Sequence, residues 1–314
     1  MTRLVKDDPD SPGERRKKVV MKHSICKICR NVSEHVFNKM ILFKYDVSFF
    51  KCSVCGFMQT EEPYWISEAY SSPLSATDTG LIMRPMNFSK VAESVIMKCC
   101  DPLGIFLDYG GGNGVFVRMM RDKGFDFYRY DKFADNLYAI GFDLQDVRDS
   151  KEPFELLTSI EVIEHFETPL EEISKMISIS ENVLFTTYVT DGISLSSLKE
   201  WWYLGEYNGQ HISFYSIKSL QLIAEMQGCY FYTNNVDTHM FTRKKKRNLK
   251  FSQTYNLNFG HMIKNKLVHG IDRIYNRLFM HHALLPQTLT GKDHEHLKKT
   301  IIEQQSKIST FKQK

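Results

Sequence analysis

The sequence lacks three features, each of which would assign the protein to a particular structural class. No part of its 314 residues approaches the ~18 consecutive apolar residues that a membrane-spanning helix requires. The 41 basic and 37 acidic residues give a net charge of only +4, which argues against a highly charged tail protein and an extended basic surface for nucleic acid. No internal repeat is found, which argues against a solenoid. What remains is a chain with 42% hydrophobic residues, enough to bury the core of one main domain with small additions.

The N-terminal segment lacks the apolar stretch of a secretory signal. Residues 1–22 are polar and charged and include a basic run at residues 15–18, so we predict a disordered tail. Without a signal or a membrane span, the expected location is the cytoplasm. Seven cysteines, four of them in two Cys-x-x-Cys pairs, indicate a metal site rather than disulfides in that reducing compartment.

The two cysteine pairs predict a structural zinc site. Four thiolates in two such pairs suit tetrahedral Zn²⁺, with iron as a minor alternative, and a closed thiolate shell leaves no open position for a substrate. We therefore predict a zinc-binding module at residues 23–62, in which the stretch ILFKYDVSFFKC forms a short strand pair. The predicted ligands are Cys26, Cys29, Cys52 and Cys55, and the remaining Cys99, Cys100 and Cys229 are expected in the core.

Strands and helices alternate from Gly104 onward. The segments GIFLDYG, FDFYRYD, FELLTSI and ENVLFTTYV have the pattern of buried strands, whereas VFVRMMRDKG and TPLEEISKMISI have helical spacing. This alternation predicts a parallel sheet with helices on both faces. Two later segments, YFYTNNV and THMFTRK, are expected as antiparallel strands, and residues 243–314 as a helical C-terminal extension.

A glycine-rich loop follows the first of these strands. Its spacing is Asp108-x-Gly110-x-Gly112-x-Gly114, and glycines between a strand and a helix let backbone N–H groups approach a ligand closely. A dinucleotide-binding loop would need a small residue where this chain has a valine, so NAD is disfavoured. Asp131 closes the second strand, where a carboxylate can accept hydrogen bonds from both hydroxyls of a ribose.

These motifs resemble those of a known enzyme family. Residues 108–187 resemble the cofactor-binding half of class I S-adenosylmethionine-dependent methyltransferases, including the segment SIEVIEHF, which is similar to the family's E-V-x-E-H stretch. The resemblance implies a Rossmann-like, doubly wound, mostly parallel seven-stranded sheet over residues 85–242. It further implies that the methionine part of the cofactor is held by Asp108, Gly110, Gly112 and Gly114, the ribose by Asp131, the adenine by Phe133 and the floor of the pocket by Glu161.

A second motif resembles a sub-group of this family that modifies sugars or glycan-type metabolites. The segment NGQHISFYS is similar to the motif H-x-S-x-[FY]-S of that sub-group, which includes deoxysugar C-methyltransferases and also carries an N-terminal four-cysteine zinc module. The last 70 residues do not resemble the additional C-terminal domain of those enzymes. The resemblance therefore implies a sugar or sugar-like acceptor, free or linked to a nucleotide or lipid, and leaves oxygen or carbon open as the methylated atom.

The acceptor must lose a proton, and histidine is the side chain best suited to take it near neutral pH. We predict His211 as the general base, because it lies in the substrate-facing loop and in the sub-group motif. His165 and Glu164 are further catalytic candidates. Because they are adjacent in a helical start, they are expected to point in different directions, one orienting substrate and the other capping the helix. An aromatic platform for a sugar ring is expected from Trp201, Trp202, Tyr203 and Tyr207.

Two other functions stay open. An RNA methyltransferase would use the zinc module and the basic runs at residues 15–18 and 243–247 on phosphates, although the Asn/Asp-Pro-Pro-Tyr/Phe stretch typical of base-methylating enzymes is replaced here by SIEV. A non-catalytic scaffold would bind the cofactor without turnover. The C-terminal stretch FGHMIKNKLVHGIDRIYNRLFMHHALL is expected to pack on the main domain or, alternatively, to contact a membrane surface.

Overall fold

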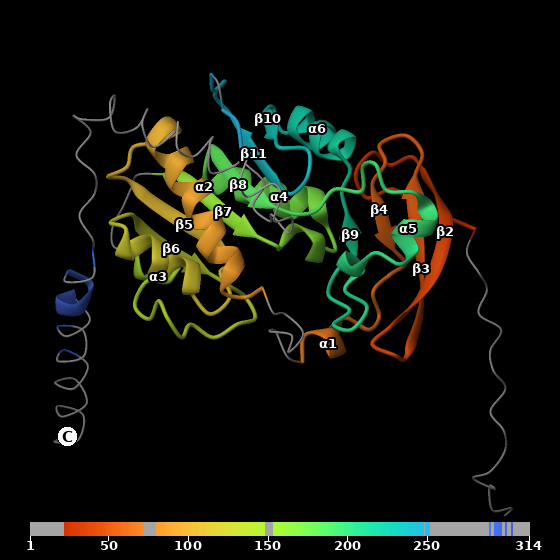
Figure 1. Cartoon of the computed structure of the whole chain (residues 1–314), viewed down its shortest axis with the longest axis horizontal. Helices are drawn as coiled ribbons and strands as arrows, with labels where there is room; N and C mark the ends of the chain where they lie inside the picture. Colours follow the sequence, from red (N-terminus) through yellow and green to blue (C-terminus); the bar gives the residue numbers. More distant parts are fainter. Residues whose placement is uncertain are drawn as a thin grey trace, which may run out of the picture.

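The computed structural model describes residues 22–71, 80–147, 153–247, 249–251, 289, 292–296, 299 and 303. They form two β-sheets that lie side by side, with β9 between them (Figure 1). One sheet has five strands in the order β1-β2-β3-β4-β9, and the other has six in the order β10-β11-β8-β7-β5-β6.

The five-stranded sheet contains both cysteine pairs and is larger than the predicted strand pair. Its pairs are all antiparallel, and its strands are β1 (His23–Ile25), β2 (Val32–Ile41), β3 (Tyr45–Cys52), β4 (Met58–Thr60) and β9 (Ser213–Phe214). The last strand comes from a distant part of the chain and completes the sheet beside β4. The apolar face of this sheet also packs against distant parts of the chain. Phe49 and Met58 lie in one buried cluster with Leu198, Tyr203 and Phe214.

The six-stranded sheet follows the predicted alternation. Its parallel part consists of β5 (Ile105–Tyr109), β6 (Asp126–Tyr130), β7 (Leu156–Ile160) and β8 (Asn182–Thr186), and its antiparallel edge of β10 (Tyr230–Thr233) and β11 (Thr238–Thr242).

The predicted count of seven strands is wrong for the described part of the chain. Beyond β6, the sheet edge carries only an isolated parallel bridge between Arg129 and Asp143. The chain cannot continue there as a strand because Asp143 is the N-cap of a short 3₁₀ turn, η1 (Leu144–Asp146), and its side chain accepts a hydrogen bond from the turn's backbone.

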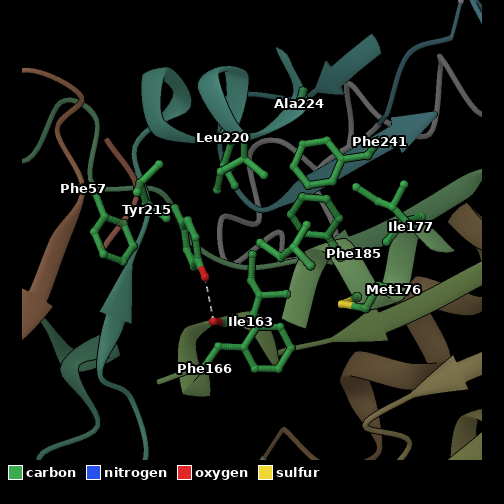
Figure 2. Packing of buried hydrophobic residues seen from close by; sticks show 14 of the residues in the cluster. Phe57, Ile163, Phe166, Met176, Ile177, Phe185, Tyr215, Leu220, Ala224 and Phe241 are labelled. Carbon is green, nitrogen blue, oxygen red and sulfur yellow. Dashed lines mark hydrogen bonds between the residues drawn. The ribbon is translucent and has the colours of Figure 1, made fainter. Parts of the chain in front are cut away.

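Helices cover both faces of this sheet. Successive strand residues point to opposite faces, so Phe106 packs under α2 (Met83–Cys99) and α3 (Val115–Asp122), whereas Leu107 packs under α4 (Pro169–Ile179) and α6 (Ile217–Met226). Figure 2 shows the second of these layers, with Leu220 of α6 beside Phe241 and above Phe185 of the sheet. The remaining short helices are α1 (Ile66–Ala69), η2 (Ile163–His165), α5 (Leu195–Lys199) and η3 (Trp202–Leu204).

The three cysteines outside the two pairs lie at the edges of the cores. Cys99, Cys100 and Cys229 are each half-buried and pack against the buried clusters beside the six-stranded sheet. They therefore contribute apolar surface at the ends of their elements, in line with the expectation of core positions.

A small part of the C-terminal extension packs on α3. Residues 292–296 are helical, and the buried carboxylate of Asp293 accepts hydrogen bonds from Arg118 and Arg121 at 2.8–2.9 Å. The stretch that was expected to pack or to contact a membrane lies outside the described residues, as does the predicted tail apart from Lys22. None of the helices in the described part is long and apolar enough to cross a bilayer.

Candidate active site

A cavity of about 1260 Å³ lies at the carboxyl ends of the parallel strands, where open α/β sheets bind ligands. Its walls come from the loops of the six-stranded sheet on one side and from the five-stranded sheet with residues 200–211 on the other. Eight of the predicted site residues line it: Asp108, Gly110, Gly112, Asp131, Phe133, Glu161, His165 and His211. Gly114 and Glu164 are not among the residues that line it.

The three spaced glycines have different roles. All have positive φ, which favours glycine over other residues. A Cβ at Gly110 would lie 2.5 Å from a methyl of Val162, and one at Gly114 would lie 2.8 Å from Cβ of Ala139. The lack of a side chain at Gly110 and Gly114 therefore lets Val162 and Ala139 pack closely against the loop. A Cβ at Gly112 would meet no atom of the described residues within 4 Å. Because Gly112 lines the cavity, its missing side chain leaves open space at the cavity wall.

Asp131 connects the two loops that follow β5 and β6. Its Oδ2 accepts a hydrogen bond from the N–H of Gly112 at 2.8 Å, and its Oδ1 accepts two more, from the N–H groups of Phe133 and Ala134. An ionised carboxylate offers about four acceptor positions, so Asp131 retains capacity for a ligand hydroxyl. The predicted ribose acceptor therefore also holds the glycine loop in place.

Asp108 lies deeper than Asp131. It is 2% exposed, its Oδ1 accepts a hydrogen bond from the hydroxyl of Thr158 at 2.8 Å, and burial raises the pKa of its carboxyl to about 7. A cationic ligand beside it would favour the ionised form and lower that pKa.

Glu161 provides an acceptor with no partner. Its backbone has φ of +55° and donates a hydrogen bond to the hydroxyl of Thr186 at 3.0 Å. Its buried Oε1 has no hydrogen-bond partner in the described part of the chain, and burial raises the pKa of this carboxyl. A buried acceptor on the cavity wall is the kind of group that a ligand's ammonium or hydroxyl satisfies.

The ring of Phe133, at the cavity wall, packs against a second aromatic ring. Its half-exposed ring stacks on Tyr70, with centroids 4.3 Å apart, and the hydroxyl of Tyr70 lies 3.1 Å from Nδ1 of His165. Tyr70 thus links the predicted adenine side to the predicted catalytic side. Sequence reasoning missed it, since no motif or spacing connects it to either histidine.

Glu164, His165 and His211 converge, and the expectation that Glu164 and His165 point apart is wrong. One ligand atom from each lies within 4.8 Å of the others. The reason is that η2 is a single 3₁₀ turn, and the carbonyl of Glu164 accepts a hydrogen bond from the N–H of Ile212, which brings the neighbouring His211 beside it. Neither residue caps α4. The N-cap of this helix is Thr168, whose side chain makes no capping hydrogen bond.

The hydrogen bonds around this cluster define the state of His211. Its Nδ1 lies 2.6 Å from the carbonyl oxygen of Tyr203, which can only accept, so Nδ1 carries the proton and Nε2 of the neutral ring has a lone pair. Nε2 lies 4.0 Å from Oε1 of the fully buried Glu164, which also accepts a hydrogen bond from the Tyr203 hydroxyl at 2.8 Å. Burial lowers the pKa of His165 well below its usual value, so this ring is neutral near pH 7.

The predicted aromatic platform is only partly present. Tyr203 is among the residues at the cavity wall, but it is 1% exposed and its hydroxyl donates to Glu164, so it offers no open face to a sugar ring. Trp202 and Tyr207 are more than half exposed and line the cavity, together with the half-buried Trp201. The exposed Phe43 contacts Tyr207, with ring centroids 5.3 Å apart.

The four paired cysteines form one cluster with the geometry of a metal site. Their Sγ atoms all lie within 4.8 Å of one another, with 3.6 Å between Cys26 and Cys55 and 3.4 Å between Cys29 and Cys52. Sulfurs bound tetrahedrally at about 2.3 Å from Zn²⁺ lie about 3.8 Å apart, so the thiolates fit this ion with small adjustments.

The second basic run is largely engaged within the chain. Lys244 forms an ion pair with Glu181 at 3.0 Å, and Arg243 and Lys246 donate hydrogen bonds to the carbonyls of Gln227 and Cys99. Three of the five cations at residues 243–247 thus have partners, which weakens the case for a phosphate-binding surface at this run.

Comparison with known proteins agrees with this architecture. Residues 88–233 match a family model described as a methyltransferase domain, so this part of the chain has the α/β methyltransferase fold. No curated protein matches the sequence significantly. The match identifies the kind of domain and leaves its substrate open.

Several solved structures of methyltransferases are similar at low identity. Magnesium protoporphyrin IX methyltransferase of Synechocystis, solved with bound SAH, is 13% identical over 56% of this chain and 90% of its own, with a TM-score of 0.36. A possible histamine N-methyltransferase of Thermotoga maritima is 14% identical over 52% and 92%, with a TM-score of 0.36. A chain from the complex of the Haloferax volcanii Trm112 methyltransferase activator with a putative methyltransferase is 10% identical over 57% and 98%, with a TM-score of 0.39. These scores are too low to assign a substrate.

Proposed function

We propose that the protein transfers a methyl group from S-adenosylmethionine to a sugar or sugar-like small molecule, free or linked to a nucleotide or lipid. One observation carries this proposal: a single cavity joins the glycine loop and Asp131 to the cluster around His211. The glycine loop suits a methyl donor, and the histidine cluster suits an acceptor that must lose a proton.

The donor side of the cavity, residues 108–134 with Glu161, fits S-adenosylmethionine. The open space at Gly112 admits the ligand, and the unpartnered Oε1 of Glu161 suits its ammonium group. Asp108 and the glycine loop hold the methionine part, Asp131 the ribose and Phe133 the adenine. When bound, the cofactor supplies an electrophilic methyl group, and the role of these residues is to orient it and exclude water.

The acceptor side, residues 200–211 with η2, handles the proton. Nε2 of His211 accepts it from a hydroxyl or from a carbon beside a carbonyl, while the Tyr203 carbonyl keeps the ring in the required tautomer. Burial and the nearby Glu161 raise the pKa of Glu164, and a protonated His211 ring 4.0 Å away would in turn favour its ionised form, so the proton on His211 and the charge of Glu164 are coupled. Trp202 and Tyr207 offer faces for a sugar ring.

The four thiolates of the cysteine cluster are proposed to hold a structural Zn²⁺. Three of the four cysteines are buried, and a closed thiolate shell leaves no position for water or substrate. The metal therefore stabilises the five-stranded sheet and takes no part in the chemistry.

The donor assignment is tested by calorimetric titration with S-adenosylmethionine. Asp131→Ala is expected to weaken binding at least tenfold, because it removes the ribose acceptor and releases Gly112. Asp135→Ala, an exposed change in the same loop, is the control and should bind like the parent. Equal affinity of Asp131→Ala and the parent would contradict the assignment.

The base assignment is tested by turnover with a panel of nucleotide-linked deoxysugars and, in parallel, with RNA. His211→Gln should bind the donor normally and lose at least a hundredfold in turnover, as expected for a general base. Full activity of this variant would remove His211 as the base, methylation of RNA alone would favour the RNA alternative, and donor binding without any turnover would favour the scaffold.

A further inference from the structure

The segment that carries His211 belongs structurally to the five-stranded sheet. β9 begins two residues after His211, and Ser213 and Phe214 pair with Gln59 and Met58 of β4. The N–H of Thr60 donates to the carbonyl of Ile212 at 3.1 Å, one residue from the base. His211 is therefore attached to the strand that leaves the second cysteine pair.

Two further hydrogen bonds hold the start of the same segment. The indole N–H of Trp65 donates to the carbonyl of Gly209 at 2.8 Å, and the side-chain amide of Gln210 donates to the carbonyl of Ala69 at 3.0 Å. Both partners of the segment lie in the chain that follows β4. The residues on either side of His211 are thus fixed by residues 58–69.

The second cysteine pair contacts this segment directly. The hydroxyl of Ser216 donates to the carbonyl of Cys55, one of the four clustered cysteines, at 2.6 Å. Gly56 has φ of +77°, and a Cβ there would lie 2.8 Å from the Ser216 hydroxyl, so only glycine permits this contact. The Cys55 turn and the end of the His211 segment therefore lie in close contact.

The contact continues into the catalytic turn η2. Tyr215, next to Ser216, stacks edge-on against Phe57 with centroids 5.2 Å apart, and its hydroxyl donates to the carbonyl of Ile163 at 2.9 Å, the bond drawn in Figure 2. Ile163 precedes Glu164 and His165. A displacement of the Cys55 turn would reach the base cluster both through β9 and through η2.

We infer that Ser216 is a positioning residue that couples the four-cysteine site to His211. The metal fixes the Cys55 turn, the Ser216 hydroxyl fixes β9 to that turn, and β9 fixes the ring of His211 against the Tyr203 carbonyl. This inference rests on the proposed function, because it gives the structural metal a defined effect on the proposed base.

The test follows the histidine rings of the full-length protein, labelled with ¹⁵N-histidine, by NMR. His211 is assigned by the loss of its signals in His211→Gln. In the zinc-loaded parent we expect one tautomer, protonated on Nδ1. The buried His239 serves as an internal control, since Thr233 and the carbonyl of Thr187 hold both of its nitrogens.

Ser216→Ala should retain one zinc per chain and bind S-adenosylmethionine within twofold of the parent, while the His211 signals change to a tautomer mixture. Because Ser216 also caps α6, two further variants separate the roles. Gly56→Ala retains Ser216 as the N-cap residue of α6, crowds the contact of its hydroxyl with Cys55 and should shift the same signals. Ser194→Ala removes the matching cap of α5 and should leave His211 unchanged.

Removal of zinc from the parent with a chelator should move the His211 signals and leave those of His239 in place. The inference is overturned if the His211 signals in Ser216→Ala match those of the parent, if Ser194→Ala produces the same change, or if zinc removal moves both rings alike or neither. These spectra need no donor or acceptor. A protein that fails to bind the donor would therefore refute the proposed function without affecting this result.

Discussion

The two sides of the cavity differ in how far apart in the sequence their contacting residues lie. On the donor side, the hydrogen bond between Gly112 and Asp131 spans 19 residues. On the acceptor side, the bond between Trp65 and Gly209 spans 144 residues, and the bond between Ser216 and Cys55 spans 161. One side is a local βαβ unit, and the other forms only when two distant segments meet.

This difference means that the two sides depend on different parts of the molecule. The donor side requires β5, α3 and β6 to be intact, whereas the acceptor side requires the cysteine cluster and β4 as well. Damage to the cysteine cluster should therefore separate the two functions, leaving donor binding while removing the geometry needed for proton transfer.

The largest effect is expected from Cys55→Ser, which removes one of four thiolates. Zinc content should fall from one per chain to none, and the apparent Tm should drop by more than 10 °C, because structural zinc sites contribute on the order of 10 kcal/mol to folding. Donor affinity should change less than threefold. Metal analysis, thermal unfolding and calorimetry measure these effects.

Cys229→Ser is the matched control, since this half-buried cysteine lies outside the cluster. This variant should bind one zinc per chain and unfold at the same apparent Tm as the parent. Retention of a full zinc by Cys55→Ser would contradict the four-thiolate site, and loss of donor binding in step with zinc would contradict the independence of the two sides.

The contact of Asp293 with α3 supports the donor side from a distant part of the sequence. Asp293→Ala removes the buried partner of Arg118 and Arg121. These arginines keep their ion pairs with Asp122 and Asp126, so we expect a loss of about 3 kcal/mol of unfolding free energy, the low end of the cost of breaking a buried pair. Urea denaturation should show this loss, and the exposed change Glu295→Ala should show none. Equal stability of the two variants would contradict the contact between residues 292–296 and α3.

The smallest effects concern the glycine loop and separate packing from binding. Gly110→Ala forces a Cβ against Val162 and should cost about 3 kcal/mol. The new methyl of Gly112→Ala fits into open space, so this change should lower the unfolding free energy by only about 1 kcal/mol, because of the left-handed backbone. It should nevertheless weaken S-adenosylmethionine binding tenfold or more, because the methyl occupies the space proposed for the ligand. Chemical denaturation and calorimetry on both variants test this. Normal donor affinity in Gly112→Ala would place the ligand elsewhere in the cavity.

The same contrast explains which features the sequence could predict. The strand before Gly110, the spacing of the glycines and the acid at Asp131 are all encoded within one short segment, so pattern and spacing predict them. The convergence of Glu164, His165 and His211 could not be predicted in this way, since it requires a hydrogen bond between Glu164 and Ile212. Adjacent residues were expected to diverge because a regular helix was assumed where a single 3₁₀ turn occurs.

The role of Tyr203 was missed for a related reason. Its neighbours Trp202 and Tyr207 are exposed, and composition alone cannot distinguish a surface aromatic ring from a buried one. The seventh strand was expected from the family resemblance, yet Asp143 turns the chain into η1 after a single bridge. The two-residue strand β9 carries no periodicity by which a sequence could predict its partner.

The pairing of β4 with β9 also sets an order of assembly during synthesis. The first four strands of the five-stranded sheet leave the ribosome well before residue 213, so β4 has one edge without a partner while most of the methyltransferase domain is being made. An open strand edge is a template for association with other chains. The three-residue edge of β4 therefore stays open to other chains in this interval, which ends when the strand beside the proposed base arrives.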